Sequence, residues 1–236
     1  MIDLIIIIII FSVIQSIFGV GLLLFGTPTL LLIGYSYVET LWILLPCSII
    51  ISLIQSIENY PLVRAKRKVA YFTIPAMTFS LIFIVSYDYV IDIRKVVGLF
   101  LIFIGIVKFS SKLQIYLQFF IEKQLRLYYV LIGFIHGVSN MGGGPLSILM
   151  STVYTDKAKI RANIAFIYLV LASFQLMILF IIDSTSLKYA NFALMLVSLG
   201  AYLIANKYIA DKVNDKKYII LINILILTYG ILAFLG

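Results

Sequence analysis

Three consecutive glycines and a proline, Gly142-Gly143-Gly144-Pro145, interrupt a run of apolar residues long enough to lie inside a lipid bilayer. In a helix, glycine costs about 1 kcal/mol relative to alanine and proline about 3 kcal/mol, so we expect the helix to break here. A broken backbone inside hydrocarbon is tolerated only where it is buried in protein or lines a wet cavity. Because breaks of this kind form substrate sites in many transporters, this stretch is the first candidate site.

The composition is that of a membrane protein. Of the 236 residues, 63% are hydrophobic and only 12% are charged. The apolar runs are continuous and lack the alternation of barrel strands, which favours helices. A net charge of +8 would direct attention to nucleic acid in a soluble protein. Here the basic residues lie in short loops between apolar segments, where they set orientation in the bilayer, so no nucleic-acid partner is expected.

The predicted fold is all-α and polytopic, with about eight membrane segments. An amphipathic linker at 112–126, expected at the membrane interface, divides an N-terminal repeat at 1–111 from a C-terminal repeat at 127–236. The expected segments are 4–34, 38–57, 69–87, 96–111, 127–152, 162–182, 189–206 and 218–235.

The two halves echo each other, which indicates an internal duplication. Gly19 precedes Gly26 by seven residues, as Gly137 precedes Gly144. Gly26-Thr27-Pro28 parallels the glycine-proline stretch of the second half after a shift of one residue. The first segment of each four-segment repeat is therefore predicted to be broken or re-entrant.

The basic residues favour an inverted arrangement. If all eight segments cross, the loops on the two sides hold nine basic residues each. If the first segment of each half instead turns back, one side holds groups of four, four, three and four, fifteen in all, and the other side holds three. Basic residues gather on the cytoplasmic side of membrane proteins, so the second arrangement is preferred, with the N-terminus outside. Each half then has three spans, which inverts one half relative to the other.

The chain resembles the sulfite exporter TauE/SafE family of membrane transporters. The resemblance rests on the Gly-rich broken segments that open each half, on Lys159-Ile160-Arg161-Ala162-Asn163 at the start of the following helix, and on the layout of two times four segments. It covers essentially the whole chain, although Gly26-Thr27-Pro28 lacks the full glycine run. The resemblance implies a multi-pass protein of the plasma (inner) membrane of a prokaryote. It also implies transport of a small anion, a sulfur oxyanion or organosulfonate such as sulfite or sulfoacetate.

The backbone at Gly142, Gly143, Gly144 and Pro145 is the main candidate for substrate binding. Freed N–H groups at the start of a half-helix, with its positive dipole end, would hold an anion. The alternative is close helix packing, which glycine also allows. Proline within the glycine run favours the site.

Polar residues just before the break are further candidates. Asn140 and Ser139 could bind substrate or could satisfy the broken backbone. His136 is the only histidine. It could relay protons or bind an anion when charged, and the alternative is a hydrogen bond to a neighbouring helix.

The matching positions of the first half complete one set of candidates. Gly26, Thr27 and Pro28 are the expected counterparts of the second break, by the same helix-breaking argument. Gln55 and Gln175 occupy corresponding places in the helices that follow, where they could line a pathway or bond between helices.

Two residues at the start of the sixth segment are the last candidates. Arg161 and Asn163 could attract an anion at a vestibule, or Arg161 could be an orientation charge of an inner loop.

The sequence gives little support for catalysis or metal binding. Cys47 is the only cysteine, and with one histidine no metal site, cofactor or catalytic set is expected. The predicted function is therefore a transporter that works by alternating access around two broken-helix sites. The alternatives are an ion channel or a membrane assembly factor without carrier activity. A homo-oligomer and a coupling proton or ion are compatible with the sequence.

Overall fold

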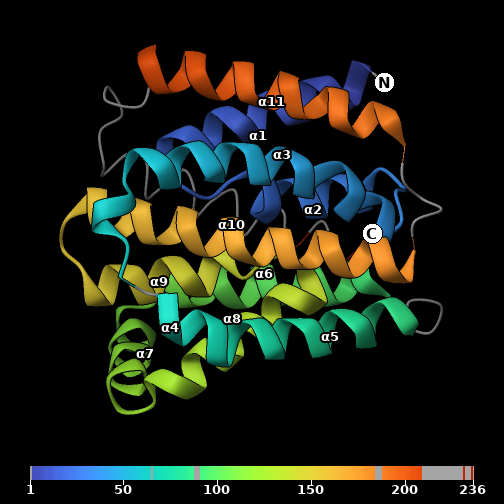
Figure 1. Cartoon of the computed structure of the whole chain (residues 1–236). Coiled ribbons are helices and arrows are strands. Elements are labelled where there is room, and N and C mark those ends of the chain that lie inside the picture. Colours follow the sequence, from blue (N-terminus) through green and yellow to red (C-terminus); the bar gives the residue numbers. More distant parts are fainter. Residues whose placement is uncertain are drawn as a thin grey trace.

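The computed structural model describes residues 2–64, 66–87, 91–183, 188–208, 231 and 235, and these residues form helices and no strand (Figure 1). The predicted last segment, 218–235, lies outside the described residues except for its positions 231 and 235. The elements are α1 (Ile2–Phe18), α2 (Leu22–Leu32), α3 (Tyr37–Glu58), η1 (Tyr60–Leu62), α4 (Lys66–Lys68), η2 (Val69–Thr73), α5 (Ile74–Ser86), α6 (Ile93–Phe109), α7 (Ser111–Lys123), α8 (Leu125–Ser139), α9 (Gly143–Val153), α10 (Lys157–Ile182) and α11 (Tyr189–Tyr208).

Three helices are long and apolar enough to cross a membrane. They are Tyr37–Glu58, Lys66–Ser86 and Ala158–Ile182. The pair Ile93–Val107 and Ser111–Lys123, bent by 101°, would add a fourth if it counts as one span. The pairs α1–α2 and α8–α9 supply shorter apolar helices, as expected if the first segment of each half is broken.

The first break lies earlier than Gly26-Thr27-Pro28. α1 ends before Gly19, which has a left-handed φ of +72°, and α2 begins at Leu22. Pro28 and its two neighbours lie inside α2, where the helix accommodates the proline. The prediction that this motif marks the break is therefore wrong, because the conformationally free glycine that precedes it ends the first helix.

The second break lies at 140–142 and so meets the start of the stretch at which the sequence predicts it. Asn140 ends α8 in the left-handed conformation, with φ 59°, and α9 begins at Gly143. Pro145 falls in the first turn of α9, where a missing N–H costs least. The glycine-proline stretch therefore opens a new helix instead of kinking an old one.

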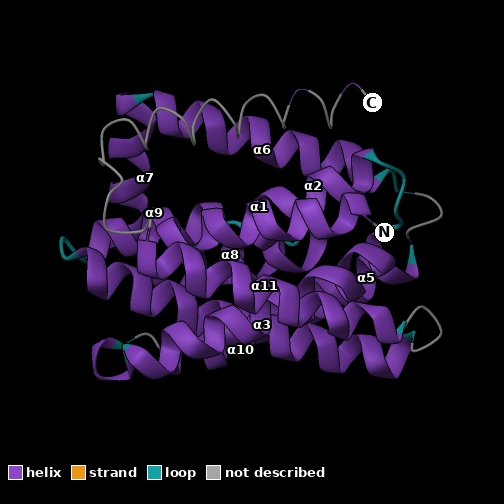
Figure 2. Cartoon of the chain, turned by 90° about the horizontal axis from the view of Figure 1, so that it is seen from above, coloured by secondary structure: helices purple, strands orange, loops and turns teal. Residues whose placement is uncertain are grey.

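Each broken pair turns back to the end of the bundle from which it came. Leu125 at the start of α8 and Val153 at the end of α9 line the same cavity. The N-terminus lies at the opposite end of the bundle, where α2 also finishes (Figures 1 and 2). The end of α1 reaches Arg161 in α10, whose Nη2 donates to the Ser16 carbonyl at 2.7 Å. The two pairs thus enter the bundle from opposite ends.

The long helices α3 and α10 pack against each other along the middle of the bundle, while α5 packs on α8 and α1 on α11 (Figures 1 and 2). Small residues permit the close contact of α5 and α8. A Cβ at Gly137 would overlap the Ser80 Oγ and the Met77 carbonyl, and one at Gly133 would overlap the Thr73 carbonyl. This is the small-residue packing that membrane helices use, since apolar burial gives them no driving force in lipid.

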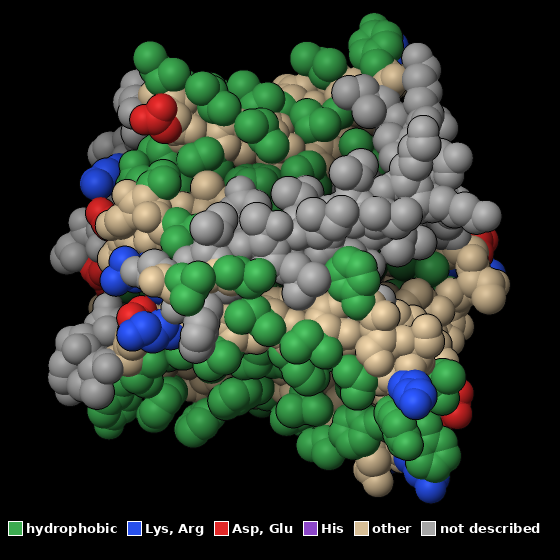
Figure 3. Space-filling model, turned by 180° about the vertical axis from the view of Figure 1, so that it is seen from behind, with side chains coloured by type: hydrophobic (Ala, Val, Ile, Leu, Met, Phe, Trp, Pro, Cys, Tyr) green, Lys and Arg blue, Asp and Glu red, His purple; other side chains and the backbone are tan. Residues whose placement is uncertain are grey.

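Hydrophobic side chains cover much of the face shown in Figure 3, and charged side chains gather toward its two ends. The side of the bundle is therefore suited to lipid, and its ends are suited to water and headgroups.

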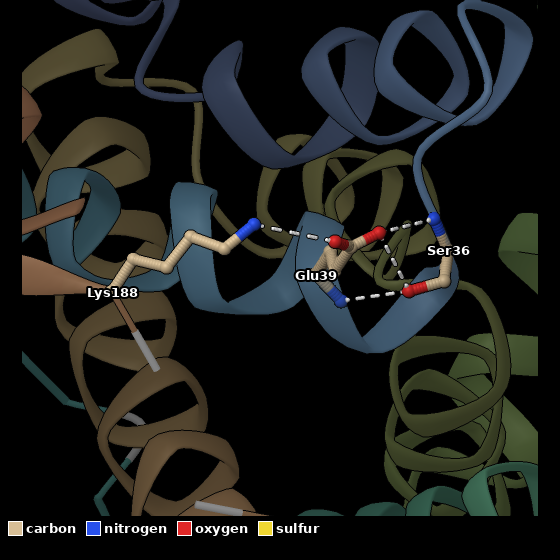
Figure 4. Close-up of polar contacts among 3 residues, drawn as sticks. All are labelled: Ser36, Glu39 and Lys188. Atoms are coloured by element: carbon tan, nitrogen blue, oxygen red, sulfur yellow. Dashed lines mark hydrogen bonds and ion pairs between the residues drawn. The ribbon is translucent and has the colours of Figure 1, made fainter. Parts of the chain in front are cut away.

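A capping box starts α3 (Figure 4). The Ser36 Oγ accepts from the Glu39 N–H at 3.2 Å, and the Glu39 Oε2 accepts from the Ser36 N–H at 3.1 Å. Lys188, just before α11, reaches the Glu39 Oε1 at 3.6 Å. The box satisfies helix donors that would otherwise be unpaired.

Candidate functional site

The two broken pairs meet at one hydrogen bond. The Asn140 Nδ2, at the second break, donates to the Thr27 Oγ1 of α2 at 3.0 Å, and both side chains are fully buried. The structure therefore brings together two predicted site residues that lie 113 positions apart in the chain. This contact is the centre of the candidate site.

His136, in the last turn of α8, stabilises the second break through a hydrogen bond. Its Nδ1 accepts from the Gly142 N–H at 3.3 Å, so a neutral imidazole carries its proton on Nε2. The Nε2 is buried and has no hydrogen-bond partner in the described structure. The imidazole therefore presents a donor to the interior of the site.

Tyr168 of α10 lies on the other side of this imidazole, with the two rings edge to face at 5.8 Å between centroids. Its hydroxyl is buried without a partner among the described residues, and it lies against Gly143 so closely that a Cβ there would overlap the hydroxyl oxygen. Sequence reasoning missed Tyr168, because it is one of sixteen tyrosines.

Gln175, which lies two turns after Tyr168 in α10, also contacts the second break. Its Nε2 approaches the His136 carbonyl at 3.5 Å, and its Oε1 is buried and unpaired in the described structure. Within the described part of the chain, four polar atoms around the second break thus have no hydrogen-bond partner: the His136 Nε2, the Asn140 Oδ1, the Tyr168 hydroxyl and the Gln175 Oε1. Since buried polar atoms in proteins nearly always have partners, this cluster is suited to hold water or a small polar solute.

The first break has its own supporting side chain, which the sequence analysis did not single out. The Gln15 Oε1 accepts from the Leu22 N–H, the first donor of α2, at 3.1 Å, and its Nε2 approaches the Ser52 Oγ of α3 at 3.5 Å. Gln15 therefore does for the first break what His136 does for the second. The only sign of this role in the sequence is that Gln15 is a single amide side chain within an apolar run.

Several other predicted residues have structural contacts. The Ser139 Oγ donates to the Ile135 carbonyl of its own helix at 2.7 Å. Gly26 packs against Leu44, whose Cδ2 would lie 2.9 Å from an added Cβ. Gln55 is buried in α3, one turn beyond Ser52.

Arg161 and Asn163 also bind backbone. Arg161 holds the last turn of α1 through the Ser16 carbonyl. The Asn163 Nδ2 donates to the Leu62 carbonyl at 3.1 Å, and its Oδ1 accepts from the Arg64 N–H at 2.8 Å. The two Asn163 contacts fix the chain around η1. Neither Arg161 nor Asn163 lines a described cavity.

Cavities open at both ends of the bundle, each with a volume of about 570 Å³. One is lined by Tyr37, Glu39, Asp92 and Arg94, and the Tyr37 hydroxyl donates to the Gly137 carbonyl at 3.0 Å. The other, at the opposite end, is lined by the basic residues of 64–68 and by the ends of α8 and α9. The second break therefore lies in buried protein between two openings.

Comparison with known proteins identifies one family. A family model described as Sulfite exporter TauE/SafE matches residues 4–233, nearly the whole chain. Neither the curated proteins nor the solved structures give a match.

Proposed function

The chain belongs to the sulfite exporter TauE/SafE family and is thus a membrane transporter, and we propose that it carries a small sulfur oxyanion or organosulfonate by alternating access around the second break. The broken backbone, the unpartnered polar atoms around it and the two openings are the features that a carrier of this kind requires.

We propose further that the two halves form inverted repeats. The contact of α5 in the first half with α8 in the second is matched by the contact of α11 in the second half with α1 in the first, and the two hairpins enter from opposite ends. In the membrane, α1–α2 and α8–α9 would then be re-entrant. The end that carries the basic residues of 64–68 would face the cytoplasm.

The observation that carries the proposal is the chemistry of the second break. The His136 Nε2–H and the Tyr168 hydroxyl are two buried donors without hydrogen-bond partners among the described residues, and they lie beside the glycine start of α9. No carboxylate is buried among the described residues, so no fixed negative charge in the core opposes an anion. Donors and a helix start in a dry site favour negative charge.

The hydrogen bond between the broken pairs supports alternating access. The Asn140–Thr27 hydrogen bond joins α8–α9 to α2, and a substrate that replaces part of this polar network would change how the two pairs associate. Movement of one pair against the other would open the break first to one cavity and then to the other.

A matched pair of tyrosines tests the site. Anion-dependent thermal stabilisation of the purified protein would be measured with sulfite, sulfate, thiosulfate, taurine, sulfoacetate and simple carboxylates, since a ligand that binds the folded state raises its stability. Tyr168→Phe should abolish the shift without lowering the ligand-free melting temperature, because this hydroxyl has no hydrogen-bond partner among the described residues. Tyr128→Phe should lower that temperature and keep the shift, because the Tyr128 hydroxyl donates to the Pro145 carbonyl at 3.0 Å.

The comparison of the two variants tests whether the anion binds at the second break. A shift with a sulfur anion that disappears only in Tyr168→Phe supports the proposal, and an equal shift in both variants would remove the anion from this site. Flux in proteoliposomes separates the carrier from a channel, since only a carrier saturates at modest substrate concentration. If the protein binds no anion and transports none into proteoliposomes, the alternative of a membrane assembly factor would be favoured instead.

A further inference from the structure

A basic cavity lies outside the second break, at one end of the bundle, and is one of the two openings of the proposed transport scheme. It has a volume of about 570 Å³ and is bounded on one side by Arg64, Lys66, Arg67 and Lys68. Ligand cavities in proteins have volumes of roughly 300–1,000 Å³, so this space is large for a bare oxyanion and suited to a bulkier molecule.

No carboxylate among the described residues neutralises the positive charge of this cavity. No ion pair to a carboxylate involves the four basic residues within the part of the chain that the structure describes. The Lys66 Nζ lies 2.6 Å from the Tyr60 hydroxyl and 3.9 Å from its ring centroid, whereas the Arg67 and Lys68 side chains are exposed. The cavity is therefore an uncompensated cationic site that would attract an anion.

Much of the remaining lining is apolar. Leu125 at the start of α8 and Met150 and Val153 near the end of α9 contribute to this apolar wall, together with the rings of Tyr129 and Tyr154. A cavity with one cationic wall and one apolar wall selects a ligand of the same two-sided character, with an anionic head and a hydrocarbon part.

The neighbouring helix places the cavity at headgroup depth. α7 leads directly into α8, and Ile115, Tyr116 and Phe119 on α7 are more than half exposed. The Lys123 Nζ lies over the Phe119 ring, 4.3 Å from its centroid. Exposed apolar and aromatic side chains together with lysines are typical of a helix that lies in the membrane interface.

We propose that this cavity binds an anionic phospholipid, with its phosphate on Arg67, Lys68 and Arg64 and its acyl chain along Leu125 and the end of α9. Basic pockets of this kind on the cytoplasmic side are a known way in which membrane proteins hold acidic headgroups. The cationic wall belongs to the first half and the apolar wall to the second. The lipid would therefore hold the end of the α8–α9 hairpin against the loop before α5 and restrain its movement.

The test compares two lipids and two charge variants of the full chain in neutral detergent. Phosphatidylglycerol and phosphatidylcholine with identical acyl chains would be added, and the melting temperature and the lipids retained in native mass spectrometry would be recorded. Arg67→Gln with Lys68→Gln removes two charges at the cavity. Arg94→Gln with Lys95→Gln is the matched control, because it removes two adjacent charges at the opposite end of the bundle. Inorganic phosphate and sulfite form two further arms.

We expect phosphatidylglycerol to raise the melting temperature and to be retained, and phosphatidylcholine to do neither. The cavity variant should lose both effects and the control variant should keep them. An unchanged response in the cavity variant would overturn the proposal, as would stabilisation by inorganic phosphate or sulfite alone that equals the lipid effect and is lost in the same variant. If inorganic phosphate or sulfite alone reproduced the lipid effect in this way, the cavity would be a vestibule for free anions. Tyr168→Phe should leave the lipid response intact, so failure of the central site and failure of this one are distinguishable.

Discussion

The Asn140 Nδ2 and the Thr27 Oγ1 lie 3.0 Å apart in the centre of the protein and connect two helix pairs that enter from opposite ends. Asn140 can serve here because its φ of 59° is one that asparagine tolerates better than most residues. A single residue thus ends α8 and binds α2.

Thr27→Val should lower the free energy of unfolding by about 1 kcal/mol, because it leaves the buried Asn140 amide with no partner on α2. Thr29→Val in the same helix is the control. The Thr29 Oγ1 donates to the Phe25 carbonyl of its own helix at 2.7 Å, so its loss should cost less. Unfolding in detergent measures both, and an equal cost would show that the contact between the pairs contributes nothing.

Gly143→Ala should destabilise the protein by about 1–3 kcal/mol, because the new Cβ would displace the Tyr168 ring. Combining it with Tyr168→Leu should recover part of the loss. Gly200→Ala in α11 is the matched control, since nothing lies within 4 Å of its added Cβ. That variant should be neutral or stabilising by up to about 1 kcal/mol. Thermal unfolding compares them, and a similar loss at both glycines would contradict the close contact at Gly143.

Gln15→Leu should destabilise the first break by about 1–3 kcal/mol, because the buried Leu22 N–H loses its acceptor. Gln118→Leu on the exposed side of α7 makes the same chemical change where no buried donor depends on it. Hydrogen–deuterium exchange should show faster exchange at the start of α2 in Gln15→Leu only. Unchanged exchange there would mean that the glutamine does not support the break.

Ser36→Ala should cost about 1 kcal/mol of stability, because it removes the acceptor of the capping box at the start of α3. Lys188→Ala should change stability by less than about 1 kcal/mol, since its ion pair with Glu39 is solvent-exposed at 3.6 Å. Thermal unfolding of the two variants ranks them, and a larger effect for Lys188→Ala would reverse this ranking.

Glycine and proline chemistry predicted the second break to within a few residues, because Gly142, Gly143 and Pro145 disfavour a continuous helix; Gly143 and Pro145 themselves lie in the first turn of α9. The same reasoning failed at Pro28. A proline inside a helix is tolerated when neighbours support the backbone, and Gly19 had already ended the first helix. Long apolar segments such as α3 and α10 also followed directly from the sequence.

The composition of the site could be predicted only in part. Asn140, His136 and Gln175 were found because polar side chains are rare in such segments. Tyr168 and Gln15 were not, because their roles depend on which helix faces which, a long-range property that one sequence does not reveal. Arg161 and Asn163 are polar for a different reason: they bind backbone carbonyls of distant segments.

The two breaks are alike in backbone and unlike in the chemistry of the group that supports them. The Leu22 N–H donates to the Gln15 amide, which also reaches Ser52 of α3, whereas the Gly142 N–H donates to the His136 imidazole, which packs against Tyr168 of α10. Each break is therefore coupled to a different one of the two long central helices. A substitution at Tyr168 should change hydrogen exchange of the Gly142 amide more than that of the Leu22 amide, and a substitution at Ser52 should do the reverse.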